Sequence, residues 1–149
     1  MDSDIMTVER TISAPPEQIF ALLSDAGRHQ GFDGSGTVRG TRAESRPLTL
    51  GTTFGMAMHM GVGYRTSNTV VEFEQDRRIA WKTTGLKGLV GGRIWRYELE
   101  PVEGGTLVKE SWDVSQDKQK FFLKRSKMPA ATKNGMRRTL ERIAEAVER

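Results

Sequence analysis

The sequence predicts one α+β domain over residues 1–149, with a curved antiparallel sheet of about six or seven strands. A long helix closes the chain, and two short helices follow the first strand. Three observations predict this class. Apolar and polar residues alternate repeatedly between residues 52 and 114, as in half-buried strands. Apolar residues near the end recur at helical spacing. The length of 149 residues, without repeats or a linker, suits one domain.

The first elements are a strand and a short helix. Residues 6–12 alternate apolar and polar side chains, and Pro15 and Pro16 end this strand. Proline is well tolerated in a first helical turn, and the acidic Glu17 suits the helix dipole there. One face of the helix then carries Ile19, Leu22 and Leu23. Residues 25–36 are rich in glycine and aspartate, which is typical of turns and leaves room for a second helical turn.

The middle of the chain reads as consecutive antiparallel strands. In residues 93–100, Trp95, Tyr97 and Leu99 share one face, and charged residues occupy the other. Gly104-Gly105 is a hairpin signal. The predicted strands are residues 52–62, 65–73, 79–83, 93–100 and 107–114.

The last segment predicts an amphipathic helix that begins near Pro129 and covers the sheet. Its apolar stripe consists of Met136, Leu140, Ile143 and Val147. A sheet built from hairpins has one face to bury, and this helix is the evident cover. Since a strongly curved sheet leaves a gap beneath a single helix, we expect an internal cavity.

Composition narrows the classes of function. The absence of cysteine excludes disulfides, a thiol nucleophile and cysteine-ligated metal, and it suits a reducing compartment. The N-terminus has no apolar signal region, and no stretch approaches the ~20 apolar residues of a membrane span, so we expect a cytoplasmic protein. Residues 116–149 hold 10 basic and 4 acidic residues, against 13 and 15 in residues 1–115. Because the basic charge is not spread over the main body, no nucleic-acid partner is expected.

The order of elements and several motifs resemble the START-related SRPBCC superfamily, which includes polyketide cyclases. Residues 8–25 (VERTISAPPEQIFALLSD) look like its first strand and helix. Its middle strands resemble residues 51–60 (GTTFGMAMHM) and residues 70–83 (VVEFEQDRRIAWKT). YELEPVEGGTLVKESWDV resembles the final hairpin, and GMRRTLERIAEAVE the closing helix. The resemblance covers nearly the whole chain. It implies a helix-grip fold with an apolar ligand between sheet and helix, and it carries over no catalytic residue, metal or cofactor.

Candidate lining residues are those whose strand phase turns them inward. On one strand these are Phe54, Met56, Met58 and Met60, which form either ordinary core or a deformable cavity wall, because thioethers repack easily. Later strands place large aromatic residues inward, and their N–H and O–H groups need partners when buried. The remaining candidates for ligand contact are Trp81, Trp95, Tyr97, Trp112, Phe122 and Met136.

Glu110 is the anomaly of this pattern. It shares the phase of Val108 and Trp112, so it is either a buried polar anchor or a solvated residue in an irregular strand. A buried carboxylate must be paired, hydrogen-bonded or protonated. Arg65, which shares the phase of Val71 and Phe73, is a candidate partner and a further candidate for ligand contact.

Other motifs are less specific. His29 and His59 would act as general bases only if they faced the pocket, and a surface position is favoured for both. The glycine-rich segments 34–40 and 85–92 lack nucleotide-binding fingerprints and read as turns, the second as a lid beside the cavity.

Residues 118–127 set Phe121, Phe122 and Leu123 among five cations. They are either a connection whose phenylalanines fill the core or a contact for an anionic membrane or acidic partner.

These observations predict a protein that binds or carries a small hydrophobic ligand, lipid-like or aromatic. Two alternatives remain open. One is a cyclase or dehydratase that uses the same cavity, which requires a titratable group facing it. The other is a regulatory module with a vestigial, filled pocket.

Overall fold

The computed structural model describes residues 1, 3–25, 28–29, 38–41, 47–60 and 62–148. The side chains of residues 38–41, 56–60, 62–65 and 87 lie outside this description.

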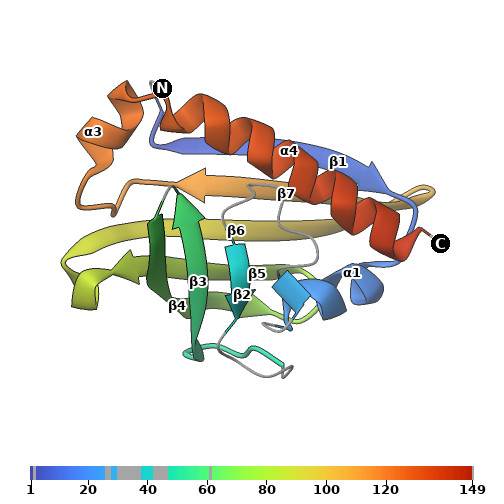
Figure 1. Cartoon of the computed structure of the whole chain (residues 1–149). Coiled ribbons are helices and arrows are strands. Elements are labelled where there is room, and N and C mark those ends of the chain that lie inside the picture. The colour runs from blue at the N-terminus through green and yellow to red at the C-terminus, as the bar shows by residue number, and fades with distance from the viewer. Residues whose placement is uncertain (2, 26–27, 30–37, 42–46, 61, 149) are drawn as a thin grey trace.

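One antiparallel sheet of seven strands organises the fold, in the order β1-β7-β6-β5-β4-β3-β2. Figure 1 shows strong curvature, since β2 and β3 run steeply across the direction of β6 and β7. This confirms the predicted α+β, helix-grip class. The strands are β1 Ile5–Ile12, β2 Val38–Thr41, β3 Thr53–Met60, β4 Val62–Glu74, β5 Arg78–Gly85, β6 Val90–Val102 and β7 Gly105–Asp113.

Two of the connections differ from the sequence interpretation. Residues 34–40 were expected to form turns, but β2 begins at Val38 and pairs with β3. The tight turn before β7 is Glu103-Gly104, one residue earlier than the glycine pair suggested. Gly105 stays within β7, where its backbone lies too close to Ile12 for any Cβ.

Two helices lie on the same side of the sheet. The first, α1 (Pro16–Leu23), starts at a proline and buries Ile19, Phe20, Leu22 and Leu23. The second expected short helix falls on residues 25–36, of which only residues 25, 28 and 29 are described. The long helix α4 (Met128–Val147) starts one residue before Pro129, and it crosses β1 and β7 with α1 beneath its C-terminal end (Figure 1).

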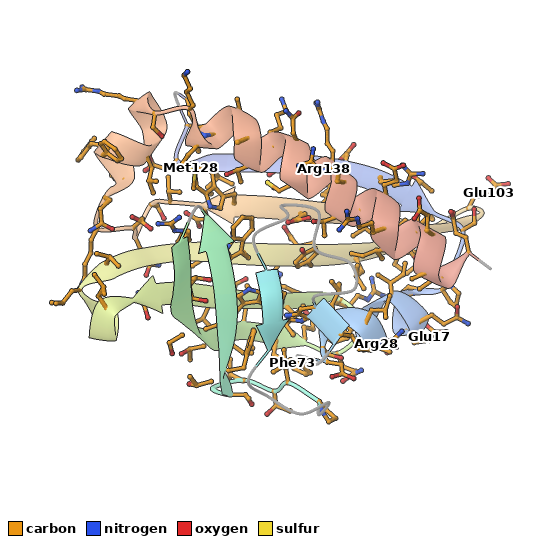
Figure 2. All side chains as sticks on the ribbon, in the orientation of Figure 1. Glu17, Arg28, Phe73, Glu103, Met128 and Arg138 are labelled. Carbon is orange, nitrogen blue, oxygen red and sulfur yellow. The ribbon has the colours of Figure 1, made fainter. Side chains whose placement is uncertain are left out.

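The core lies between α4 and the face of the sheet that it covers, here called the inner face. Met136, Leu140 and Ile143 of the predicted stripe are buried, and Val147 is half-buried. Met128, labelled in Figure 2, packs against the same core at the start of the helix. No described helix combines the length and apolar character required to cross a bilayer.

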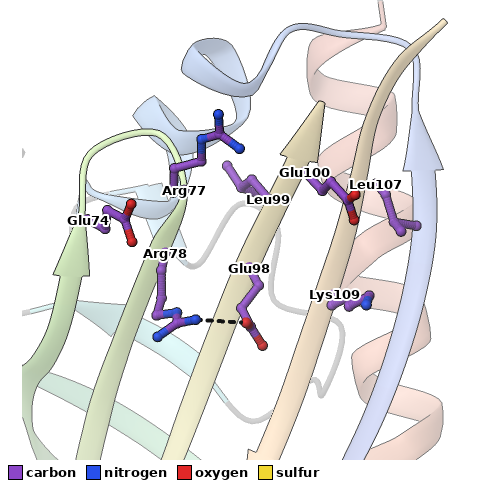
Figure 3. A pocket seen from close by; sticks show the side chains of 8 residues that line it. All are labelled: Glu74, Arg77, Arg78, Glu98, Leu99, Glu100, Leu107 and Lys109. Atoms are coloured by element: carbon purple, nitrogen blue, oxygen red, sulfur yellow. Dashed lines mark hydrogen bonds and ion pairs between the residues drawn. The ribbon is translucent and has the colours of Figure 1, made fainter. Parts of the chain in front are cut away.

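The opposite, outer face carries a charge ladder, the row Glu74, Arg78, Glu98, Lys109 and Glu9 on five adjacent strands. Opposite charges face each other at every step, and Arg78 Nη2 lies 3.2 Å from Glu98 Oε2. Figure 3 shows most of this row lining a shallow groove of about 380 Å³, with α4 behind the sheet. The groove therefore opens on the side of the sheet that faces away from α4.

A second set of charges flanks the ladder. Arg96 donates three hydrogen bonds to the carboxylate of Glu72, the shortest at 2.7 Å, and lies 3.5 Å from Asp113. These hydrogen bonds from Arg96 hold the pKa of the Glu72 carboxyl below its usual range, although partial burial opposes the shift.

Candidate functional site

Strand register brings the predicted aromatic residues together on the inner face. Trp81, Trp95 and Trp112 stand directly opposite one another across β5, β6 and β7. Residues directly opposite in antiparallel strands lie on the same face of the sheet. A second row, one pleat along, consists of Ile79, Tyr97, Glu110 and Val8.

The aromatic rings form one connected group, here called the aromatic cluster: Phe54, Trp81, Tyr97 and His29. Trp81 is its centre, with ring centroids 5.8 Å from Phe54 and 5.6 Å from Tyr97. The rings of Trp95 and Trp112 lie 6.3 Å apart on the neighbouring strands. The four residues of the aromatic cluster and Trp112 are buried, and Trp95 is half-buried, so this part of the inner face is largely apolar.

His29 corrects the sequence interpretation, which favoured the surface for this residue. Its side chain is buried and stacks on Trp81 at 4.8 Å between centroids, with an interplanar angle of 22°. Its Nε2 donates to the carbonyl oxygen of Leu23 at 2.9 Å, which fixes the proton on that nitrogen. Burial lowers the pKa of His29 to about 4, so the ring is neutral at pH 7. No periodicity in the glycine-rich segment around it signals this position.

Asn68 is a second inner-face residue that sequence reasoning missed. It is buried opposite Phe54, and its amide donates to the Phe54 carbonyl oxygen and to Thr66 Oγ1. Its Oδ1 accepts a hydrogen bond of 2.6 Å from Thr83. These contacts satisfy a polar side chain inside an apolar face. The alternation of Asn68 with Val70 is the signal that would have found it.

Glu110 lies on the inner face, as its phase predicts, and is 2% exposed. The argument that paired it with Arg65 is wrong. A bulge between Val70 and Glu72 reverses the alternation of β4, so Arg65 shares the register of Ser67 and Thr69 rather than that of Phe73. The Arg65 side chain itself is outside the described residues.

Trp112 is the most informative buried polar group. Its side chain is fully buried beside Trp95, and it stands opposite Met6 of β1. Among the described residues no acceptor reaches its Nε1. A buried indole N–H normally has a hydrogen-bond partner, so this donor is available to a group that enters the inner face.

The remaining candidates divide three ways. Met136 of α4 is buried in the core cluster together with the aromatic residues. Met56, Met58 and Met60 continue the β3 alternation of Phe54, but their side chains lie outside the described residues. Phe122 is a correction, because it lies on α3 (Lys120–Arg125) and is 74% exposed, and so it cannot line an interior site.

Solved structures confirm the fold. Protein CV1439 from Chromobacterium violaceum matches 98% of this chain and 98% of its own, with TM-score 0.75 and 16% identity. Protein Ms6760 from Mycobacterium smegmatis matches 97% and 91%, with TM-score 0.72 and 13% identity. DynU16, from the dynemicin biosynthetic locus, has TM-score 0.69 and 18% identity over 96% of this chain and 46% of its own. At these identities the likeness concerns the fold alone.

Sequence comparison gives the family. The uncharacterized protein Rv0088 of Mycobacterium tuberculosis is 32% identical over 104 residues, which cover 68% of this chain and 44% of that protein. The match thus spans less than half of this relative. The family model for polyketide cyclase/dehydrase and lipid transport proteins matches residues 4–148. The chain therefore belongs to the polyketide cyclase/dehydrase and lipid transport family, within the SRPBCC superfamily.

Proposed function

We propose that this protein binds a small hydrophobic ligand, lipid-like or aromatic, on the inner face between the sheet and α4. The family and fold suggest a ligand-binding or cyclase-like role. The aromatic cluster supports an apolar and partly flat ligand, since aromatic rings offer large apolar surfaces with preferred stacking geometries. A few polar groups in such a lining orient the ligand.

The observation that carries the proposal is the indole N–H of Trp112. This donor is fully buried on the inner face and has no acceptor among the described residues. A ligand with a carbonyl or hydroxyl oxygen would accept its hydrogen bond. Oxygenated aromatic molecules should therefore bind more tightly than hydrocarbons of the same shape.

The test compares α-tetralone, a bicyclic aromatic ketone, with tetralin, its hydrocarbon counterpart, by isothermal titration calorimetry. The parent protein should prefer the ketone by about 3- to 10-fold, the range expected for one net neutral hydrogen bond. Trp112→Phe keeps a large ring but removes the N–H, so it should bind both molecules with nearly equal affinity. Trp95→Phe alters the neighbouring ring and should retain the preference.

Two results would contradict the proposal. Absence of saturable binding by either molecule and by long-chain fatty acids would exclude the site. An unchanged preference for the ketone in Trp112→Phe would show that another group recognises the oxygen.

An enzymatic role is the second candidate, supported by the buried carboxyl group of Glu110. Glu110 is next but one to Trp112 on β7, so both belong to the inner face. A carboxyl group in this position is a candidate proton donor or acceptor for a ligand held by Trp112. Mass spectrometry of the ligand after prolonged incubation distinguishes the two roles, because a carrier returns its ligand unchanged.

We place this binding activity in the cytoplasm. The absence of cysteine supports this location, because it is compatible with a reducing compartment.

A further inference from the structure

Two neighbouring segments at one end of the sheet expose large apolar side chains. Phe121 and Phe122 of α3 are 69% and 74% exposed, and Leu86 and Leu89 around the short helix η2 (Leu86–Gly88) are 71% and 72% exposed. In Figure 1 both segments lie at the left-hand end, α3 in orange above and the β5–β6 connection in yellow-green below. We call this the apolar end surface.

Hydrogen bonds hold the two segments together. The Lys118 backbone N–H donates to the Gly91 carbonyl at 2.9 Å, and the Gly91 N–H donates to Gln119 Oε1 at 2.9 Å. The Lys118 ammonium group also donates to the carbonyl oxygen of Gly88. The two segments that carry the exposed leucines and phenylalanines therefore meet at the same end of the sheet.

The apolar end surface is strongly basic. Residues 86–89 and 118–127 contain six basic residues and no acidic one. Asp4 offsets one of these charges, since it forms ion pairs with Lys120 at 3.3 Å and Lys124 at 2.8 Å. Arg125 and Lys127 are exposed and make no ion pair among the described residues. Arg125 and Lys124 also border a depression beside Phe121.

We propose that the apolar end surface docks on an anionic lipid bilayer, with the phenylalanines and leucines entering the interface and the cations meeting the headgroups. A bilayer accepts protruding rings without a matching pocket, and aromatic side chains favour the interface. Anionic lipid attracts each nearby cation by an amount that corresponds to roughly a fivefold gain in binding. The basic charge and the exposed phenylalanines and leucines therefore favour an anionic membrane over a protein partner.

The surface lies beside the proposed ligand site. Trp112 is near the end of β7, and the chain reaches Lys118 six residues later. Docking here would bring the inner face close to the membrane, where apolar ligands accumulate. This benefit rests on the proposed function, whereas docking itself is measurable without any ligand.

The test is flotation with phosphatidylcholine vesicles, with and without phosphatidylglycerol, at low and high salt. The parent protein should float only with the anionic vesicles, and salt should weaken the association by screening. Arg125→Glu/Lys127→Glu should reduce binding at least 20-fold, because two attractions are lost and two repulsions are gained. Phe121→Ser/Phe122→Ser should reduce binding at least tenfold, and neither variant removes a buried residue.

Arg77→Glu/Arg137→Glu is the matched control, since both arginines are exposed elsewhere and the change in net charge is the same. It should keep most of the binding. Loss of binding in this control equal to that in Arg125→Glu/Lys127→Glu would overturn the proposal, as would failure of the parent protein to float at low salt. If the parent is instead a dimer that Phe121→Ser/Phe122→Ser dissociates, without vesicle binding, the occupant is a second copy. Trp112→Phe should float like the parent protein, so the experiment distinguishes a failure of membrane docking from a failure of ligand binding.

Discussion

Burial of His29 makes the stability of the protein depend on pH in a range where few other groups titrate. The unfolded chain has the ordinary histidine pKa of 6.5, whereas the folded protein has a value of about 4. The folded state therefore binds fewer protons between these two values, and stability must fall as the pH falls through this range. The hydrogen bonds of Asp4 and Glu72 lower the pKa values of these carboxyl groups, so their contributions to stability are lost as the pH falls below the ordinary values of 3.8 and 4.5.

The expected loss follows from the two pKa values of His29. Between about pH 7 and pH 5 the free energy of unfolding should decrease by about 2 kcal/mol, and by about 3 kcal/mol once the pH is below 4. The reason is that protonation requires a charge in the apolar environment between Trp81 and Leu23. For a domain of this size, 2 kcal/mol is a large part of the total.

Urea unfolding followed by tryptophan fluorescence measures this dependence at a series of pH values. His29→Gln keeps an N–H donor for the Leu23 carbonyl but does not titrate, so its stability should change by only a few tenths of a kcal/mol over the same range. An equal slope in the parent and in His29→Gln would refute the assignment, whatever the absolute stability of the variant.

Two further predictions concern stability. Arg96→Gln removes the hydrogen bonds that lower the pKa of Glu72, so acid unfolding, followed by circular dichroism, should begin at higher pH than in the parent. Gly105→Ala should lower the free energy of unfolding by more than the ~1–2 kcal/mol expected of an alanine in a left-handed conformation, because the added Cβ would overlap the Ile12 carbonyl oxygen. Gly104 has φ +85° but no atom near the position of an added Cβ, so Gly104→Ala should lose only the conformational part of that free energy. Equal thermal unfolding temperatures of the two variants would contradict the packing argument.

The strands and the long helix could be predicted from the sequence because the spacing of apolar residues specifies which face of each element is buried. Strict alternation in β6 and β7 gave the inner positions of Tyr97, Glu110 and Trp112, and the helical stripe gave Met136. These faces hold because no bulge interrupts the pairing of β6 with β7. The same reasoning failed in β4, where an extra residue after Val70 moves all earlier positions to the opposite phase.

Other positions depend on tertiary contacts that have no local signal. His29 is buried because its ring is surrounded by Phe54, Trp81 and Leu23. The first two are distant in the sequence, and Leu23 is not related to His29 by a helical or strand period. Phe122 was expected inside, since phenylalanine is usually buried, yet only Leu123 of α3 packs inward. A six-residue helix has too few turns for its apolar face to be read from periodicity.

The charge ladder helps to set the strand register from the outer face, whereas the residues that would contact a ligand lie on the inner face. Moving β5 by two residues against β6 would set Arg78 opposite Arg96 instead of Glu98, so the correct register is favoured without help from the inner face. Substitutions among the inner aromatic residues then alter the shape of the lining while the strands keep their pairing. Related chains can thus acquire different ligand preferences on the same sheet, and a designer can vary the inner face of β5, β6 and β7 while leaving the ladder intact.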